Sequence, residues 1–175
     1  MKYLYYALTH GKSFVSKSIE FWTRSSLSHA LFVNDVLFDK QKYEEPGVFI
    51  EMWKKPKENF LQLRCIKSSV LYHSPGTKFD FYRLKVNDDV YDKVHEFQRI
   101  CAYLEIPYDW KAIVGFVIPF KLKKDGHLFC SEKECLSLKY AGIVPKDYPC
   151  WKCSPDRFKD LLELIGAEMF DSFTI

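Results

Sequence analysis

The chain has 175 residues and a mass of 20.7 kDa, with 26 Lys and Arg against 23 Asp and Glu, a formal net charge of +3. Hydrophobic residues make up 47% of it, which excludes intrinsic disorder and predicts one globular domain over residues 1–175. The small net charge argues against a nucleic-acid partner, because dedicated binders carry a concentrated basic face. Six cysteines are more than such a chain needs for packing, so they require an explanation.

The N-terminus and the apolar stretches bear on location. The first ten residues, MKYLYYALTH, contain a short apolar run interrupted by tyrosines and no small-residue cleavage site, so we predict no secretory signal. No run of about 18 apolar residues is present, so we predict no membrane-spanning helix. We therefore expect a cytoplasmic protein, in which cysteines are more often catalytic, metal-binding or buried than disulfide-bonded.

The predicted elements of the first half are mainly strands. The Asn34-Asp35 pair between two apolar runs predicts a hairpin. A short helix is expected over residues 13–23. Strands are expected over residues 2–8, 30–33, 36–39, 48–53, 61–66 and 79–86.

The predicted elements of the second half are helices. Apolar residues recur every three or four positions between residues 90 and 104, on one face of a helix that ends before Pro107. Two shorter helices are expected over residues 131–141 and after an N-cap at Ser154. The predicted fold class is α+β, with an antiparallel sheet packed against helices.

Cys130 is the candidate nucleophile. It follows a loop and stands at the start of a predicted helix, where exposed backbone N–H groups and the helix dipole favour a negative charge. A thiol at such a position is shifted toward the thiolate, its nucleophilic form. The alternative interpretation is an inert buried cysteine, which is among the commonest fates of this residue.

His29 is the candidate base, and Glu51 is the candidate group that orients it. His29 stands at the mouth of an apolar strand, where its side chain can meet a nucleophile from another element. Glu51 is the polar residue of an otherwise apolar strand, so it either faces water or needs a buried partner such as a histidine. The other histidines lie in weaker contexts; they are His10, His73, His95 and His127.

Together these residues resemble a known pattern. Ser28-His29-Ala30 opens a strand, Glu51 lies in a later strand, and Phe129-Cys130-Ser131-Glu132 precedes a helix. This order resembles the circularly permuted papain-like, NlpC-type cysteine hydrolases, which include YiiX-like and YebB-like proteins and are related to the lecithin retinol acyltransferases. Residues 106–110 (IPYDW) and the Ser154-Pro155-Asp156 cap are also similar to stretches of that superfamily.

The resemblance implies a permuted papain-like fold and a Cys-His-Glu arrangement of Cys130, His29 and Glu51. It implies a hydrolase, either an amidase or peptidase or an acyl-ester or thioester hydrolase, or an acyltransferase, that works through a thioester acyl-enzyme. No cofactor and no metal is expected. One departure is residues 133–135 (KEC), which stand where that superfamily usually has apolar residues.

Two other functions remain open from the sequence. Four cysteines, Cys130, Cys135, Cys150 and Cys153, could form a zinc site, although their first spacing is loose for one. The same fold could also serve as a catalytically inactive binding module, because function depends on sites rather than on folds. The spacing of Cys150 and Cys153 also matches that of thiol exchangers, but no predicted strand precedes the pair.

The substrate class is open as well: a small molecule, a peptide or a lipid-like acyl compound. Residues 113–120 are apolar and are followed by three lysines up to residue 124. Residues 113–124 therefore predict either an apolar lid with a peripheral membrane contact or a buried helix with a basic exit. The oligomeric state is not predicted.

Overall fold

The computed structural model describes most of the chain. The described residues are 1–12, 14–23, 25–34, 44–45, 47–53, 63–109, 111–112 and 124–175. Within them, none of the helices combines the length and the apolar character needed to cross a bilayer.

A six-stranded antiparallel sheet is the centre of the fold, and its strands run in the order β4-β3-β2-β1-β5-β6. The predicted α+β class with an antiparallel sheet is thereby confirmed. The strands are β1 (Lys2–His10), β2 (His29–Val33), β3 (Phe49–Trp53), β4 (Arg64–Ser68), β5 (Lys78–Val86) and β6 (Glu168–Thr174).

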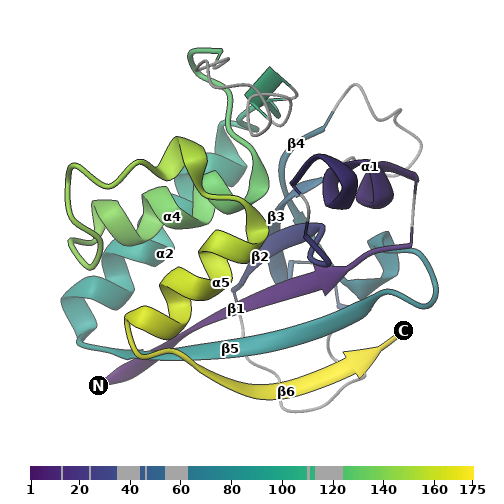
Figure 1. Ribbon diagram of the computed structural model, residues 1–175. Coiled ribbons are helices and arrows are strands. Elements are labelled where there is room, and N and C mark those ends of the chain that lie inside the picture. Colours follow the sequence, from purple (N-terminus) through teal and green to yellow (C-terminus); the bar gives the residue numbers. More distant parts are fainter. Residues whose placement is uncertain are drawn as a thin grey trace.

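Three helices gather on one face of the sheet, whereas α1 lies at the other end of the molecule (Figure 1). The helices are α1 (Phe14–Thr23), α2 (Asp88–Tyr103), α4 (Cys130–Tyr140) and α5 (Pro155–Leu164), with short 3-10 turns η3 (Val70–Tyr72) and η4 (Cys150–Lys152). Each predicted helix is present, with ends that shift by a few residues.

Local capping explains where two of these helices begin. The side chain of Asn87 accepts a hydrogen bond from the backbone N–H of Val90 at 2.9 Å, which satisfies one amide at the start of α2. Ser154 accepts from the N–H of Arg157 at the start of α5, and Pro155 takes the first helical position. These starts depend on neighbouring residues alone, so the sequence was sufficient to predict them.

Both faces of the sheet are buried. On the helix side, the Tyr6 ring makes edge contacts with Phe32 and Phe158, with centroids 5.6 and 5.4 Å apart. On the other side, Phe79 stacks on Phe49 and on Phe173, with centroids 5.9 and 5.5 Å apart. Because both faces are dry, a polar side chain on β2 or β3 needs a protein partner.

The strand predictions meet three different outcomes. The predicted hairpin includes residues 36–39, which lie outside the described residues; β2 itself pairs with β1 on one side and β3 on the other. The fourth strand begins at Arg64 rather than at residue 61, and residues 61–62 are also outside the described part. The pattern missed β6, a half-exposed edge strand whose place depends on pairing with β5.

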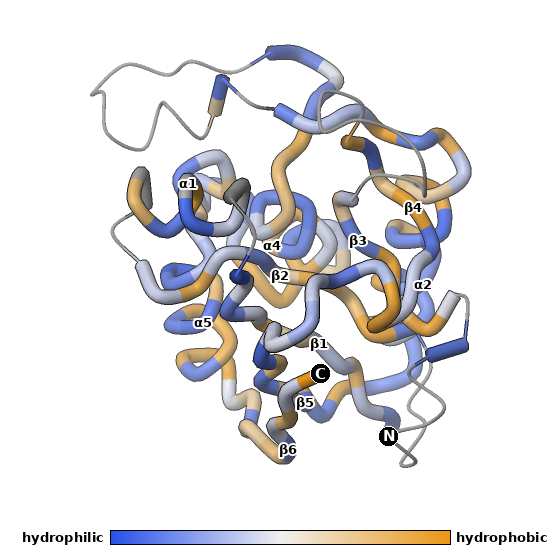
Figure 2. Tube along the Cα trace, turned by 90° about the vertical axis from the view of Figure 1, so that its right-hand side faces the viewer, coloured by the Kyte–Doolittle hydropathy of each residue, from blue (hydrophilic) through white to orange (hydrophobic). Residues whose placement is uncertain are grey.

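Helix α4 is buried although its sequence is polar. Figure 2 shows hydrophilic stretches on α4, which lies toward the middle of the molecule. Its first six residues are all buried, and four of them have polar or charged side chains; these are Ser131, Glu132, Lys133 and Glu134. Helices α2 and α5 and strand β2 all contact α4, so its start is enclosed by protein.

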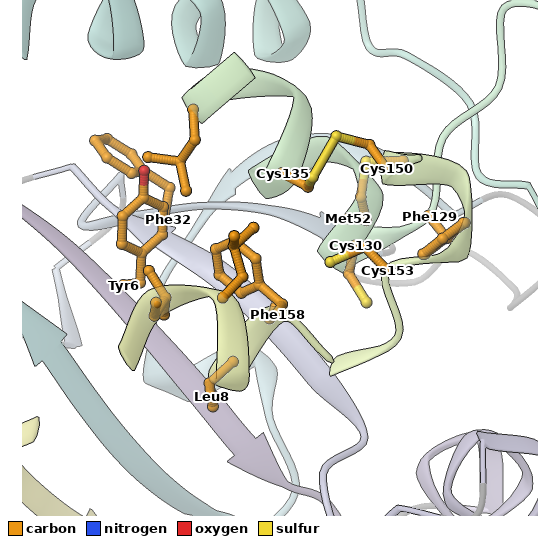
Figure 3. Packing of buried hydrophobic residues seen from close by; sticks show 14 of the residues in the cluster. Tyr6, Leu8, Phe32, Met52, Phe129, Cys130, Cys135, Cys150, Cys153 and Phe158 are labelled. Carbon is orange, nitrogen blue, oxygen red and sulfur yellow. A yellow bond between two sulfur atoms is a disulfide. The ribbon is translucent and has the colours of Figure 1, made fainter. Parts of the chain in front are cut away.

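Cys135 and Cys150 form a disulfide that ties α4 to the segment before α5 (Figure 3). The sequence left the roles of Cys135 and Cys150 open, and the compartment expectation made a disulfide the less common outcome. The bond argues against the zinc alternative, because two of its four proposed ligands are bonded to each other. In the described part of the chain, no group of three or more His, Cys, Asp or Glu side chains could hold a metal ion.

The disulfide predicts a thiol count. In denaturant without reductant, four of the six cysteines should react with a thiol reagent, and a Cys101→Ser variant should show three. The double variant Cys135→Ser, Cys150→Ser should unfold with about 3 kcal/mol less free energy, the value expected for a loop of about 15 residues. Six reactive thiols in the untreated protein would contradict the pairing.

Candidate active site

Glu51 on β3 and His29 at the start of β2 form the buried centre of the site. The Glu51 side chain is fully buried and that of His29 nearly so, and Nε2 of His29 donates a hydrogen bond to Oε2 of Glu51 at 2.7 Å. Of the two interpretations of Glu51, the structure therefore supports the buried and paired one. Because Nε2 is held by the carboxylate, Nδ1 is the ring nitrogen left for the thiol.

His73 and Ser68 complete the surroundings of Glu51, and sequence reasoning missed both. Nε2 of His73 donates to Oε1 of Glu51 at 3.2 Å, and the Ser68 hydroxyl donates to the same oxygen. Both donors are buried. His73 follows η3 in a turn that carried no sequence signal of its own, and only the fold brings it to the carboxylate.

Aromatic packing holds the two histidine rings. The Trp53 ring stacks on His73 with centroids 4.8 Å apart and lies 5.4 Å from His29. Phe79 contacts His73 edge to face, with ring centroids 5.0 Å apart. Trp53 is itself fixed, since its indole N–H donates to the carbonyl of Tyr72 at 3.0 Å. These contacts leave the imidazoles little rotational freedom.

Cys130 is the first residue of α4, and the N-terminus of that helix faces its thiol. The N-cap residue is Phe129, whose side chain has no hydrogen-bonding group and makes no capping hydrogen bond. The N–H groups of Ser131 and of Ala30 on β2 instead donate to Cys130 Sγ. The helix end therefore stabilises negative charge on this sulfur.

The thiol and the imidazole favour each other's charged forms. Burial raises the pKa of Cys130, but the charge of His29, a hydrogen bond from it and the two backbone donors outweigh burial and lower that pKa. Burial likewise lowers the pKa of His29, yet the Cys130 thiolate and the hydrogen bonds with Cys130 and Glu51 raise it to about 10. The contact therefore favours a thiolate beside an imidazolium.

The charge of Glu51 is also favoured. Burial disfavours the carboxylate, but the charge of His73 and the hydrogen bonds from both histidines hold the pKa of Glu51 well below its usual range. Glu51 is therefore ionised at neutral pH. A buried carboxylate beside His29 stabilises the imidazolium and fixes the orientation of its ring.

The candidate base and the candidate nucleophile come from opposite faces of the sheet. Strand alternation places His29 and Glu51 on the face away from the helices, with Leu31 and Phe49, whereas Cys130 belongs to the cluster on the helix side. His29 is the first residue of β2, so its ring can reach past the strand end to the thiol. The site lies where the sheet ends.

Tyr108 is a further group at the sulfur. Its side chain is buried, its hydroxyl hydrogen-bonds with Cys130, and burial together with the nearby thiolate raises the pKa of Tyr108 well above its usual value. The hydroxyl therefore stays neutral and can donate. Tyr108 belongs to residues 106–110, which drew attention only through the family resemblance, so that stretch was the available signal.

Asp109 organises the backbone around Tyr108. Its N–H donates to the carbonyl of Leu128, and its carboxylate accepts from the N–H groups of Ala112 and Lys124 at 3.1 and 3.0 Å. These bonds anchor the approach to Cys130 and the segment that precedes it. Residues 113–123, which hold most of the predicted apolar and basic stretch, lie outside the described residues.

The other free cysteines are poor nucleophiles. Burial raises the pKa of both Cys65 and Cys153 to about 12 and also raises that of Cys101. Cys65 and Cys101 lie in the core, as predicted. Cys153 lies near Cys130 in Figure 3, and its carbonyl accepts a hydrogen bond from Ser131 at 2.6 Å. Among the free cysteines, Cys130 alone has a lowered pKa.

A separate cavity of about 410 Å³ opens between the ends of β1 and β5 and the start of α5. Its lining includes neither the thiol nor the two residues paired with it, so it is a neighbour of the site rather than part of it. The lining residues are His10, Ser26, Leu27, Asp80, Tyr82, Asp156, Lys159 and Asp160.

Comparison of the sequence with protein-family models and with curated proteins finds no match. The structure brings Cys130, His29 and Glu51 together, and it adds Tyr108, His73 and Ser68 to them.

The ion pair predicts how the reactivity of Cys130 depends on pH. Alkylation of the folded protein by iodoacetamide should rise with a midpoint below about 8.5, the usual thiol pKa, because the thiolate is stabilised. A second change is expected near pH 10, where His29 loses its proton. Mass spectrometry of the labelled peptide should identify Cys130. A midpoint at or above 8.5 would contradict the ion pair.

His73 offers a test of the missed part of the site. His73→Phe keeps an aromatic ring against Trp53 and Phe79 but removes one charge and one hydrogen bond from Glu51. Because the ionised form of Glu51 then has less support, it should stabilise the His29 imidazolium less. The alkylation rate of Cys130 at pH 6 should therefore fall by about three- to tenfold. His127→Phe is the matched control, since that ring is partly exposed and bonds to the nearby carbonyl of Asp125. Equal rates for both variants would exclude a role for His73.

Proposed function

We propose that the protein is a cysteine hydrolase or acyltransferase of the permuted papain-like type. The observation that carries the proposal is the buried contact of Cys130 with His29, whose ring is held by Glu51, because this contact lowers the pKa of the thiol and raises that of the imidazole. The chain order of the three residues, with histidine first, acid second and cysteine last, supports the permuted arrangement. The six-stranded antiparallel sheet with a cysteine at the start of a buried helix is consistent with it.

The proposed reaction is acyl transfer through a thioester. The Cys130 thiolate attacks a substrate carbonyl, and the imidazolium of His29 gives its proton to the leaving group as the tetrahedral intermediate collapses. His29, now neutral, takes a proton from water or from another nucleophile that accepts the acyl group. That nucleophile attacks the thioester, which releases the product and the Cys130 thiolate. Glu51 keeps the ring oriented through both steps and stabilises its charged form.

Two donors are available for the negative charge that develops on the substrate oxygen. The backbone N–H of Cys130 at the helix start is one, and the neutral hydroxyl of Tyr108 beside the sulfur is the other. Fixed donors of this kind contribute a few kcal/mol to such reactions. The substrate bond is an amide, ester or thioester, in a small molecule, a peptide or a lipid-like acyl compound.

The proposed location is the cytoplasm. A persistent disulfide is more typical of oxidising compartments, so the thiol count of the protein taken from cells bears directly on this expectation. Peripheral membrane contact through residues 113–124 stays a prediction, because most of these residues lie outside the described part of the chain.

Cys130→Ala and His29→Ala test the catalytic assignment. Each should abolish acyl-enzyme formation with a cysteine-directed acylating probe, because one removes the nucleophile and the other its proton carrier. The measurement is the mass shift of the intact protein after incubation with the probe. Thermal unfolding of each variant should remain cooperative.

Cys153→Ala is the matched control for that experiment. It removes a neighbouring buried thiol whose pKa is raised, so the probe should still label this variant at the wild-type rate. Labelling of Cys130→Ala as fast as the wild type would show that the nucleophile is elsewhere.

A further inference from the structure

Lys133 is the most unusual side chain of the buried helix α4. A lysine is seldom fully buried, because its ammonium group loses its hydration, yet this side chain has no exposure at all. Its Nζ donates a hydrogen bond to the backbone carbonyl of Ile50 at 3.0 Å and another to Oε1 of Gln98 at 2.5 Å. One ammonium group thus joins α4 to β3 and α2.

A carboxylate and an amide complete this network. Oε1 of Glu134 lies 2.6 Å from Lys133 Nζ, a close charge contact without the alignment of a good hydrogen bond. Nε2 of Gln98 donates to the other oxygen of Glu134 at 2.5 Å. The side chains of Lys133, Glu134 and Gln98 are all fully buried, so the charges compensate each other without water.

The positions of these residues link the network to the site. Lys133 is three residues after Cys130, about one helical turn, and Ile50 immediately precedes Glu51. The Lys133–Ile50 hydrogen bond therefore connects the helix that carries the thiol with the strand that carries the acid. Figure 1 shows α2 and α4 side by side over the sheet. Gln98 on α2 accepts the second hydrogen bond of Lys133, so the network also joins these two helices.

The energetics favour a geometric role for this network. A buried ion pair adds little to stability, since its desolvation offsets much of the attraction, and apolar side chains of similar size often replace such pairs without loss. The directional hydrogen bonds of a buried cation fix the rotation of a helix about its axis and its distance from the sheet. Apolar contacts, which are not directional, fix these less strictly. In a cysteine site, a misplacement of about 1 Å can lower the rate about 100-fold.

We propose that Lys133 is a positioning residue that holds α4 against β3 and so sets the place of Cys130 relative to His29 and Glu51. Its ammonium acts through the backbone of Ile50 and the side chain of Gln98 rather than through the thiol or the imidazole. The inference deepens the proposed function. It rests on that function because the position of Cys130 relative to His29 matters for the proposed reaction.

The test removes the network in two ways. Lys133→Met removes the ammonium alone and leaves Glu134 buried without its cation, so this variant is expected to be less stable. The triple variant Lys133→Met, Glu134→Leu, Gln98→Leu replaces the whole network with apolar side chains. The matched control is Lys139→Met on the same helix, whose ammonium donates to the carbonyl of Tyr148 instead.

The readout is the rate of Cys130 alkylation by iodoacetamide as a function of pH, which needs no substrate. If α4 shifts, the thiolate loses part of its stabilisation by His29, so the midpoint should rise by about one pH unit and the rate at pH 6 should fall about tenfold. The triple variant should show this change while it still unfolds cooperatively, and Lys139→Met should behave as the wild type.

A folded triple variant with the wild-type midpoint and rate would overturn the proposal, and so would a network that proves necessary for folding itself. Failure of the proposed function looks different. In that case wild-type Cys130 would already alkylate with an ordinary midpoint, before any variant is made.

Discussion

The site depends on one constraint: the carboxylate of Glu51 is buried in the sheet, away from water. A buried negative charge is stable only with partners, and here two histidines and one serine supply hydrogen bonds to it. Because one of those histidines is His29, satisfying Glu51 also fixes the ring that faces Cys130. The contacts that stabilise the buried Glu51 carboxylate therefore also orient His29, the candidate base.

Cys130, the candidate nucleophile, depends on a second buried environment, the start of helix α4. A thiolate at the start of a buried helix is stabilised by backbone N–H groups and by the imidazolium, and little water is present to compete. The polar residues after Cys130 suit this place because they bond to protein: Ser131 to the carbonyl of Cys153, and Lys133 to that of Ile50. The Cys135–Cys150 disulfide fixes the next turn.

The surroundings of Glu51 and those of Cys130 meet because β2 begins at His29. Side chains on the helix side of the sheet and those on the other side are separated by the backbone along the strands, so a base and a nucleophile from opposite faces can touch only at an edge or an end. The short packing contacts of Trp53 and Phe79 then prevent the imidazoles from turning away. A static, enclosed geometry of this kind suits a stable ion pair.

The sequence by itself determined the local features. It predicted the helix starts at Asn87 and Ser154 and most of the strands, because caps and apolar periodicity involve neighbouring residues, and it singled out Cys130, His29 and Glu51 as candidates. Only the tertiary structure decided which polar groups are buried together. His73 beside Glu51, Lys133 beneath Ile50, the Cys135–Cys150 bond and the edge strand β6 all depend on contacts between residues far apart in the chain. The periodicity of apolar residues does not indicate such contacts. A buried lysine and an exposed one, or a histidine in a site and one in a turn, can have the same local sequence.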